Sequence, residues 1–318
     1  MTRYLLRRTA ILIGSLFAAA VVLFVLLRLL PGDPANALLP VGATPEQIEA
    51  AQRELGTDAP LLSQFLTWLG HVFTLDLGNS LISTLPVGEE IAARLPVTIP
   101  LTLAAFALAV LIAVPVGALA AARADRWYGP VINAVAQLGI AVPAFWVGLL
   151  LITVFALQLG VLPAGGFPPD GWADPAAAIE ALVLPVVTVA LVMSASLIRY
   201  VRSATLDVLG ADYLRTARAL GATPAQAMWR HGLRNAAVPV IAVLAMELAT
   251  TFLGAVVVES VFALPGLGSM LVRGISQHDY PVIQGVMLVS TATVLVVGFL
   301  GDLAQRLVDP RLLHRAAS

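Results

Sequence analysis

The chain has 318 residues, of which 59% are hydrophobic and only 12% are charged, and its formal net charge is −1. Soluble domains carry about 25% charged residues, so this composition excludes an ordinary soluble globule and predicts an all-α polytopic membrane protein. The near-zero net charge gives no reason to expect a nucleic-acid partner, and the lack of cysteine excludes disulfides and thiolate metal sites.

Six apolar segments follow one another along the chain, and each is long enough to cross the hydrocarbon core of a bilayer as a helix. The first, at about residues 9–30, could mimic a secretory signal, but its apolar run continues well beyond the small residues at 18–20 and is too long for one. The other five lie at about residues 96–122, 131–160, 181–198, 236–260 and 282–301. An even number of spans places both ends of the chain on the same side of the membrane.

The arginines indicate which side that is. With both termini in the cytoplasm, most of the 18 arginines fall in inner segments, and the exceptions are Arg28, Arg53, Arg94 and Arg273. Because basic residues concentrate on the cytoplasmic side of membrane proteins, we predict six transmembrane helices with both termini inside. The predicted regions are a first transmembrane helix at 1–30, an extracytoplasmic loop at 31–95, a five-helix core at 96–310 with a cytoplasmic loop at 203–235, and a cytoplasmic tail at 311–318.

Two outer segments carry local signals. In the loop at 31–95 we predict a short helix that has Thr44 as its N-cap, Pro45 at its first position and Gly56 as its stop. Residues 261–281 alternate turn-forming and apolar residues, a pattern that suits a short re-entrant or surface helix.

Few residues inside the spans are polar or helix-breaking. We expect Pro143 to produce a functional kink, because proline removes a helix hydrogen bond. Glu247 is the one acid near mid-bilayer depth, so it is either a functional residue or a hydrogen-bonded carboxyl at a helix contact. The aromatic residues Phe145 and Trp146 could line a pathway or could serve only for packing.

Motifs for enzyme chemistry are missing from the sequence. There is no GxxxxGK[ST] phosphate loop and no HExxH motif, and the four histidines fall in separate segments. We therefore predict a non-enzymatic chain that binds no metal and no cofactor of its own.

The cytoplasmic loop contains the most specific local pattern. Asp212 can cap a helix over 213–220, which Gly221 can end in a left-handed conformation, and Thr223-Pro224-Ala225-Gln226 can then start a second helix with a capping box. Arg215 and Arg218 would share one helix face. Binding to anionic lipid headgroups would need only the charge, whereas the two caps favour a folded element on which another protein docks.

The segment YLRTARALGATPAQAMWRHGLRN resembles the cytoplasmic EAA loop of ABC-importer permeases, with Ala217 and Gly221 at the motif's second alanine and its glycine. Arg215 stands where the general motif has glutamate, Thr216 replaces the first alanine, and Leu233-Arg234 stands where many families have Leu-Pro. These departures resemble the dipeptide/oligopeptide/nickel branch of the family. Further likeness to that branch occurs at residues 26–34, 64–80, 86–98, 256–285 and 302–311.

The resemblance implies a type I ABC importer transmembrane domain in the cytoplasmic (inner) membrane of a bacterium. It implies four kinds of partner: a homologous second permease subunit, two ABC ATPase domains that hold ATP and Mg, an extracytoplasmic substrate-binding protein, and the lipid bilayer. The substrate would be a di- or oligopeptide, or alternatively a nickel chelate, glutathione or another small solute. An ion-coupled secondary transporter that uses Glu247 and a non-transporting scaffold remain as alternatives.

Candidate residues can be named for three roles, two of them from the resemblance and the pathway role from the residues of the spans themselves. The candidates for coupling to the ATPase are Asp212, Arg215, Ala217, Arg218, Gly221, Thr223, Arg230 and Arg234. The candidates for lining the pathway are Pro143, Phe145, Trp146 and Glu247. The candidates for facing the binding protein are Leu264, Pro265, Gly266, Asp279 and Tyr280.

Overall fold

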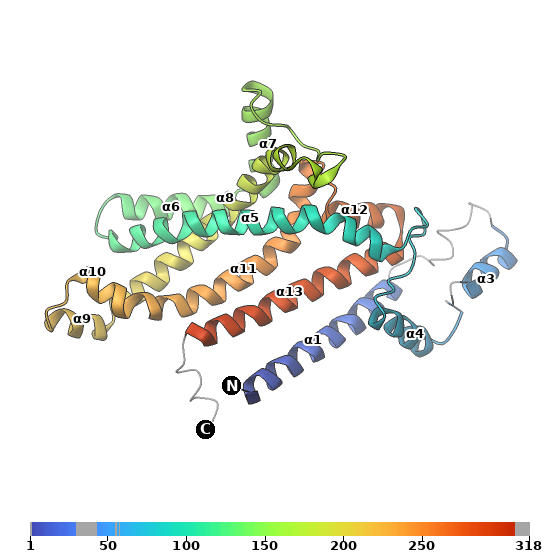
Figure 1. Ribbon diagram of the computed structural model, residues 1–318, viewed down its shortest axis with the longest axis horizontal. Coiled ribbons are helices and arrows are strands. Elements are labelled where there is room, and N and C mark those ends of the chain that lie inside the picture. Colours follow the sequence, from blue (N-terminus) through green and yellow to red (C-terminus); the bar gives the residue numbers. More distant parts are fainter. Residues whose placement is uncertain (1, 30–42, 55, 57, 309–318) are drawn as a thin grey trace. The chain divides into compact units, whose positions relative to one another are not determined.

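Long helices dominate the structure because the backbone N–H and C=O groups of a segment in hydrocarbon must be satisfied within that segment. The computed structural model describes residues 2–29, 43–54, 56 and 58–308 (Figure 1). Its long helices are α1 (Thr2–Leu29), α5 (Val87–Ala122), α8 (Pro175–Leu209), α11 (Leu233–Val261) and α13 (Tyr280–Val308). Within these described ranges there is no strand, only an isolated bridge between Asn79 and Pro86. The predicted tail at 311–318 and the start of the predicted outer loop, residues 31–42, lie outside the described residues.

Five of the described helices are long and apolar enough to cross a membrane, and a broken helix pair can supply the sixth crossing. The pair consists of α6 (Tyr128–Ala141) and α7 (Ala144–Leu151), and α7 continues into a π-helical segment (Ile152–Gln158). The two halves meet at an angle of 99°. Pro143 stands at the break and holds Val142 in an extended conformation, as proline does with the residue before it. The predicted bend at Pro143 is confirmed, but it is a complete break rather than a kink.

The long helices extend further than the apolar segments predicted. Helix α5 begins at Val87 rather than near residue 96, and α8 runs from Pro175 to Leu209 rather than from 181 to 198. The 36 residues of α5 correspond to about 54 Å of helix, well beyond a hydrocarbon core of about 30 Å. The difference arises because the hydropathy of a segment predicts only the part that lies in the hydrocarbon core. The ends of a helix depend instead on capping residues, which can lie beyond that part. At the start of α8, for example, the Asp174 carboxylate accepts hydrogen bonds from the N–H groups of Ala176 and Ala177.

The chain forms two compact units. The first comprises residues 1–3, 99–264 and 296–318, and in it α8 packs against both α6 and α11. Small residues permit this close packing. A Cβ on Gly117 would lie 2.8 Å from the carbonyl oxygen of Ile198, and one on Gly139 would lie 2.9 Å from the Cβ of Ala195. Alanines dominate the same core, which contains Ala109, Ala113, Ala136, Ala190, Met193, Leu197 and Ile198.

The segment between α7 and α8 in this unit is fixed to the end of α11. It includes a short 3-10 turn (Gly171–Ala173). The N–H of Gly166 donates to the carbonyl of Phe262 at 2.8 Å, and a Cβ on Gly165 would collide with that same carbonyl. The ring of Phe262 is buried and lies 3.1 Å from the position of a Cβ on Gly148 in α7. One residue at the end of α11 therefore contacts two other parts of the unit.

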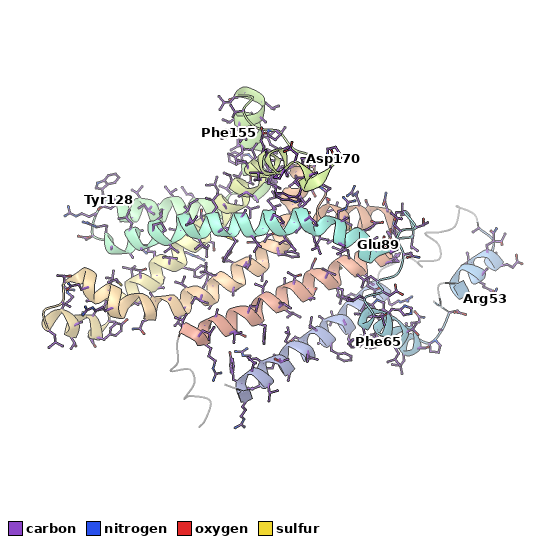
Figure 2. The ribbon with its side chains drawn as sticks, in the orientation of Figure 1. Arg53, Phe65, Glu89, Tyr128, Phe155 and Asp170 are labelled. Carbon is purple, nitrogen blue, oxygen red and sulfur yellow. The ribbon has the colours of Figure 1, made fainter. Side chains whose placement is uncertain are left out.

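The second unit comprises residues 4–98 and 265–295. It contains the short helices α3 (Pro45–Glu54), α4 (Leu61–Phe73) and α12 (Leu267–Gln277). The ring centroids of Phe65 and Trp68 in α4 lie 5.3 and 5.8 Å from that of Phe24 in α1 (Figure 2 labels Phe65). Aromatic contacts at this separation hold α4 against α1.

Two sequence predictions in the second unit are confirmed. At the start of α3 the N–H of Thr44 donates to Gln47 Oε1 at 2.9 Å, and the N–H of Gln47 donates to Thr44 Oγ1 at 3.4 Å. Gly56 follows this helix with a φ of 65°. Helix α12 is the short helix predicted within residues 261–281.

Candidate functional site

A small helical hairpin connects α8 to α11. It contains α9 (Asp212–Ala219), α10 (Pro224–Ala227) and a π-helical segment (Met228–Gly232). Figure 1 shows α9 and α10 together at one end of α8 and α11. We call residues 210–232 the capped loop. It is shorter than the predicted loop at 203–235, because α8 continues to Leu209 and α11 starts at Leu233.

The predicted start of the first hairpin helix is wrong by one residue. Ala211 is the N-cap of α9, with φ −73° and ψ 140°, and no side chain caps the helix. Asp212 lies within the first turn, where a carboxylate is stabilised by the helix dipole. It forms an ion pair with Arg215 at 3.6 Å, with 94% of the Asp212 side chain and 73% of the Arg215 side chain exposed. Asp212 thus partly offsets the charge of Arg215 instead of capping the helix.

The turn between the two helices has the predicted geometry. Gly221 adopts a φ of 96°, its N–H donates to the carbonyl of Arg218 at 3.0 Å, and the N–H of Ala222 donates to that of Ala217 at 3.1 Å. This is the Schellman arrangement of a helix end. The N–H of Thr223 then donates to Gln226 Oε1 at 3.1 Å, and the N–H of Gln226 donates to Thr223 Oγ1 at 3.2 Å. The predicted capping box is therefore confirmed.

A buried cluster supports the inner side of the capped loop. Val208, Leu214 and Ala227 form it, and Ala217, Ala222, Met228 and Ala236 pack around them. Ala217, a predicted coupling residue, is half-buried and packs against this cluster. In the structure Ala217 supports the turn, and its role in coupling stays a prediction.

The outer side of the capped loop combines charge with apolar surface. Arg218 and Arg230 are exposed, and Arg218 has no ion-pair partner among the residues that the structure describes. Leu220 is 84% exposed and Tyr213 40% exposed. Sequence reasoning missed these two apolar residues, although their spacing of seven places them on one helix face. The side chain of Arg234 lies outside the described part of the structure.

A second feature is a pocket beside the break in the α6–α7 pair. Its volume is about 240 Å³, and its polar lining consists of Ser196 from α8 with Glu247, Thr250 and Thr251 from α11. Ile140 and Ala144, on either side of the break, also line it. The structure therefore brings Glu247 and the region of Pro143 together. Phe145 and Trp146 are about half exposed and do not line this pocket.

Comparison with protein families decides the identity of the chain. Residues 113–314 match the family described as the binding-protein-dependent transport system inner membrane component, and residues 1–102 match the N-terminal part of such membrane components. The chain belongs to this family. It is a permease subunit of an ABC importer and a multi-pass protein of the bacterial inner membrane.

Relatives of the permease match it over its whole length. A Brucella abortus (strain 2308) protein named as a peptide transport system permease is 39% identical over 319 residues, which cover 99% of this chain and 100% of the relative. The glutathione transport system permease GsiC of Escherichia coli O6:H1 is 35% identical over 315 residues, which cover 99% of this chain and 100% of GsiC. A chain of the inward-facing MetNI methionine ABC transporter is 19% identical, with a TM-score of 0.57 over 69% of this chain and 96% of that chain. The last likeness shows that the permease has the type I importer fold.

The residues expected to face the binding protein are mostly inside the permease. Leu264, Gly266, Asp279 and Tyr280 are buried, and Pro265 is half-buried. The Asp279 carboxylate accepts hydrogen bonds from Ser80 Oγ at 2.5 Å, from the N–H of Leu81 at 3.2 Å and from the N–H of Val282 at 3.4 Å. The contacts of Asp279 lie within the second unit, and the four buried residues expose little surface in the permease alone. Their role in facing the binding protein stays a prediction.

Two further charged residues of the permease are buried. Glu259 near the end of α11 is fully buried, and Arg306 in α13 is 6% exposed. Neither residue was predicted to be functional, although a lone acid within the apolar run VVVESVF is itself an unusual signal. Within the described residues, no three His, Asp or Glu side chains gather as metal ligands would.

Proposed function

We propose that this permease forms half of the translocation pathway of an ATP-driven importer of di- and oligopeptides. The main support for this proposal is the capped loop, which presents Arg218 and Leu220 on a folded hairpin that continues directly into α8 and α11. The names of the relatives support a peptide substrate. Import of a nickel chelate, glutathione or another small solute by the same mechanism is the alternative.

The chain itself acts without catalysis in this proposal. Its partners are a homologous second permease subunit, two ATPase domains that bind ATP and Mg, and an extracytoplasmic substrate-binding protein. The permease has no phosphate-binding motif of its own. Energy from ATP must therefore enter it through a contact with another protein.

The mechanism is alternating access driven through the capped loop. Closure of the ATPase domains on ATP moves the loop, and α8 and α11 transmit the movement to the pathway, which opens outward to receive substrate. Hydrolysis and release return the pathway to the inward-facing state. Such coupling requires that the ATPase contacts of the loop differ between the two states.

Arg218 is the stronger of the two candidate arginines for the ATPase contact. The charge of Arg215 is already opposed by Asp212 at 3.6 Å, whereas Arg218 lacks such a partner among the described residues. Leu220, at the end of the same helix, adds an exposed apolar anchor. Arginine is among the residue types enriched where interfaces gain most of their affinity, which favours Arg218 as the main contact.

Uptake measurements test the proposed function. Proteoliposomes that contain the permease with its partner subunits should accumulate labelled di- or oligopeptide when ATP and the binding protein are present, and should continue to do so when the proton gradient is collapsed. Loss of uptake with the gradient would instead indicate an ion-coupled transporter. Purification without any ATPase subunit would indicate a scaffold.

Replacement of Arg218 by glutamate tests the docking contact. Loss of one partner of a buried interfacial ion pair costs about 2–5 kcal/mol, and a like charge in its place adds repulsion. Arg218→Glu should therefore weaken ATPase-subunit binding about tenfold or more. Co-purification and binding-protein-stimulated ATP hydrolysis measure the loss. Arg126→Glu is the matched control, because Arg126 is also an exposed arginine of an inner segment and lies outside the capped loop. Equal losses in both variants would contradict the assignment.

A further inference from the structure

The carboxylate of Glu247 lies in a membrane-spanning helix. Within the described structure it has no cationic partner. Its Oε1 accepts a hydrogen bond from Ser196 Oγ at 2.8 Å, and no described arginine or histidine lies within ion-pairing distance of it. Ionisable residues within membrane helices are costly and usually face a partner or a cavity. Glu247 is half-buried and lines the pocket beside the α6–α7 break. A cationic partner for its carboxylate would therefore have to occupy this pocket.

The hydroxyl groups around Glu247 line that pocket and can offer their oxygen atoms as hydrogen-bond acceptors. Thr250 Oγ1 and Thr251 Oγ1 donate to the backbone carbonyl of Glu247 at 3.0 and 2.7 Å, and Ser196 donates to its carboxylate. The hydrogens of these hydroxyls are therefore engaged, while their oxygen lone pairs can still accept. A primary ammonium group has three donors and no acceptor, which matches a site that offers one carboxylate and several hydroxyl oxygens.

The rest of the pocket suits the chain that would follow such an ammonium group. Apolar side chains line it, namely Ile140, Val189, Val192, Met193 and Val258. Its volume of about 240 Å³ is below the about 300–1,000 Å³ of sites that enclose a whole drug-sized ligand. The pocket can accommodate one end of an extended molecule. A single carboxylate without imidazole is in contrast a poor ligand set for nickel.

We propose that this pocket binds the free α-ammonium end of a peptide in transit, with Glu247 as its counter-ion and Ser196 as the residue that orients the carboxylate. The proposal rests on the proposed peptide-import function and adds a recognition site on the permease itself. Binding there must be weak enough for release, as passage through a transport pathway requires. Glu247 is only half-buried and lines the pocket, so its carboxylate is accessible from the cavity for such a transient contact.

The test compares two peptides on the intact transporter complex in nanodiscs without the binding protein. One peptide has a free amino terminus, and the other has the same sequence with an acetylated terminus. Glu247→Gln should weaken binding of the free peptide by at least about tenfold, the loss expected when one partner of an ion pair is removed, and should leave binding of the acetylated peptide unchanged. Glu247→Asp should restore part of the affinity. Glu180→Gln, which removes an exposed acid of the same type from α8, should change neither.

A second variant tests the same pocket in case Glu247→Gln loses binding only because it folds poorly. A Cβ added to Gly254 meets nothing within 4 Å, so Gly254→Val should fill part of the pocket without strain and should reduce binding of the free peptide. Equal binding of both peptides to wild type and to Glu247→Gln would overturn the recognition site while leaving peptide import intact. If the wild-type complex neither binds nor takes up any peptide, the proposed substrate class itself is overturned, and this site with it.

Discussion

Gly221→Val is expected to uncouple the permease from ATP hydrolysis while leaving it inserted in the membrane. Gly221 has a φ of 96°, a conformation that costs an L-residue about 1–2 kcal/mol and a β-branched residue more. To relieve the strain, the turn must give up the hydrogen bonds from Gly221 to Arg218 and from Ala222 to Ala217. Because the turn sets the positions of Arg218 and Leu220, we expect peptide uptake and stimulated ATP hydrolysis to fall by about tenfold or more.

Two further variants test whether the loss of coupling in Gly221→Val comes from the turn itself. Gly221→Asn should retain most of the activity, because asparagine tolerates the left-handed conformation. Gly56→Val introduces the same strain at a φ of 65° after the outer helix α3, also with open space around the new side chain, and should leave ATPase coupling unchanged. Normal uptake by Gly221→Val, with its amount in the membrane equal to wild type, would show that the turn is not part of the coupling path.

Asp279→Ala is expected to have the largest effect on stability. The Asp279 side chain is 3% exposed and accepts three hydrogen bonds from residues of two segments. Its removal leaves buried donors without an acceptor at about 1–3 kcal/mol each, partly relieved by relaxation, so we expect a loss of about 3 kcal/mol. The melting temperature of the detergent-solubilised permease should fall by about 6–12 °C.

The matched control for this variant is Asp76→Ala. Asp76 also accepts a hydrogen bond from a backbone N–H, that of Gly78 at 3.0 Å, but on the exposed surface and from a close neighbour in the chain. We expect a change below about 0.5 kcal/mol there. A melting temperature of Asp279→Ala equal to that of the control would show that the buried contacts of Asp279 contribute nothing to stability.

Features that depend on neighbours in the sequence could be predicted well. The N-cap at Thr44, the capping box at Thr223 and the helix stops at Gly56 and Gly221 depend on residue types close together in the sequence, and all four are found as predicted. The error at Asp212 has the same origin. Aspartate is favourable both as an N-cap and in the first turn of a helix, so its type alone does not decide between the two positions.

Features that depend on distant residues could not be predicted. Asp279 looked like an exposed polar residue of an outer segment, but it binds Ser80, which lies 199 residues away in the sequence. In the capped loop, Leu214 within α9 is buried, while Leu220, directly after the last residue of α9, is exposed. Only the packing of α9 against Val208 and Ala227 separates these two leucines. The pocket beside Glu247 likewise forms only when four helical segments come together.

The hydrogen bonds that shape the capped loop join residues at most five apart in the sequence. Contacts of such short range form early and require little loop-closure entropy. The loop can therefore acquire its shape during biosynthesis, before any ATPase subunit is present. Association with a partner then needs no coupled folding, whose ordering cost reduces the affinity of segments that are unstructured when free. Assembly of the transporter at this contact should resemble the docking of two preformed surfaces.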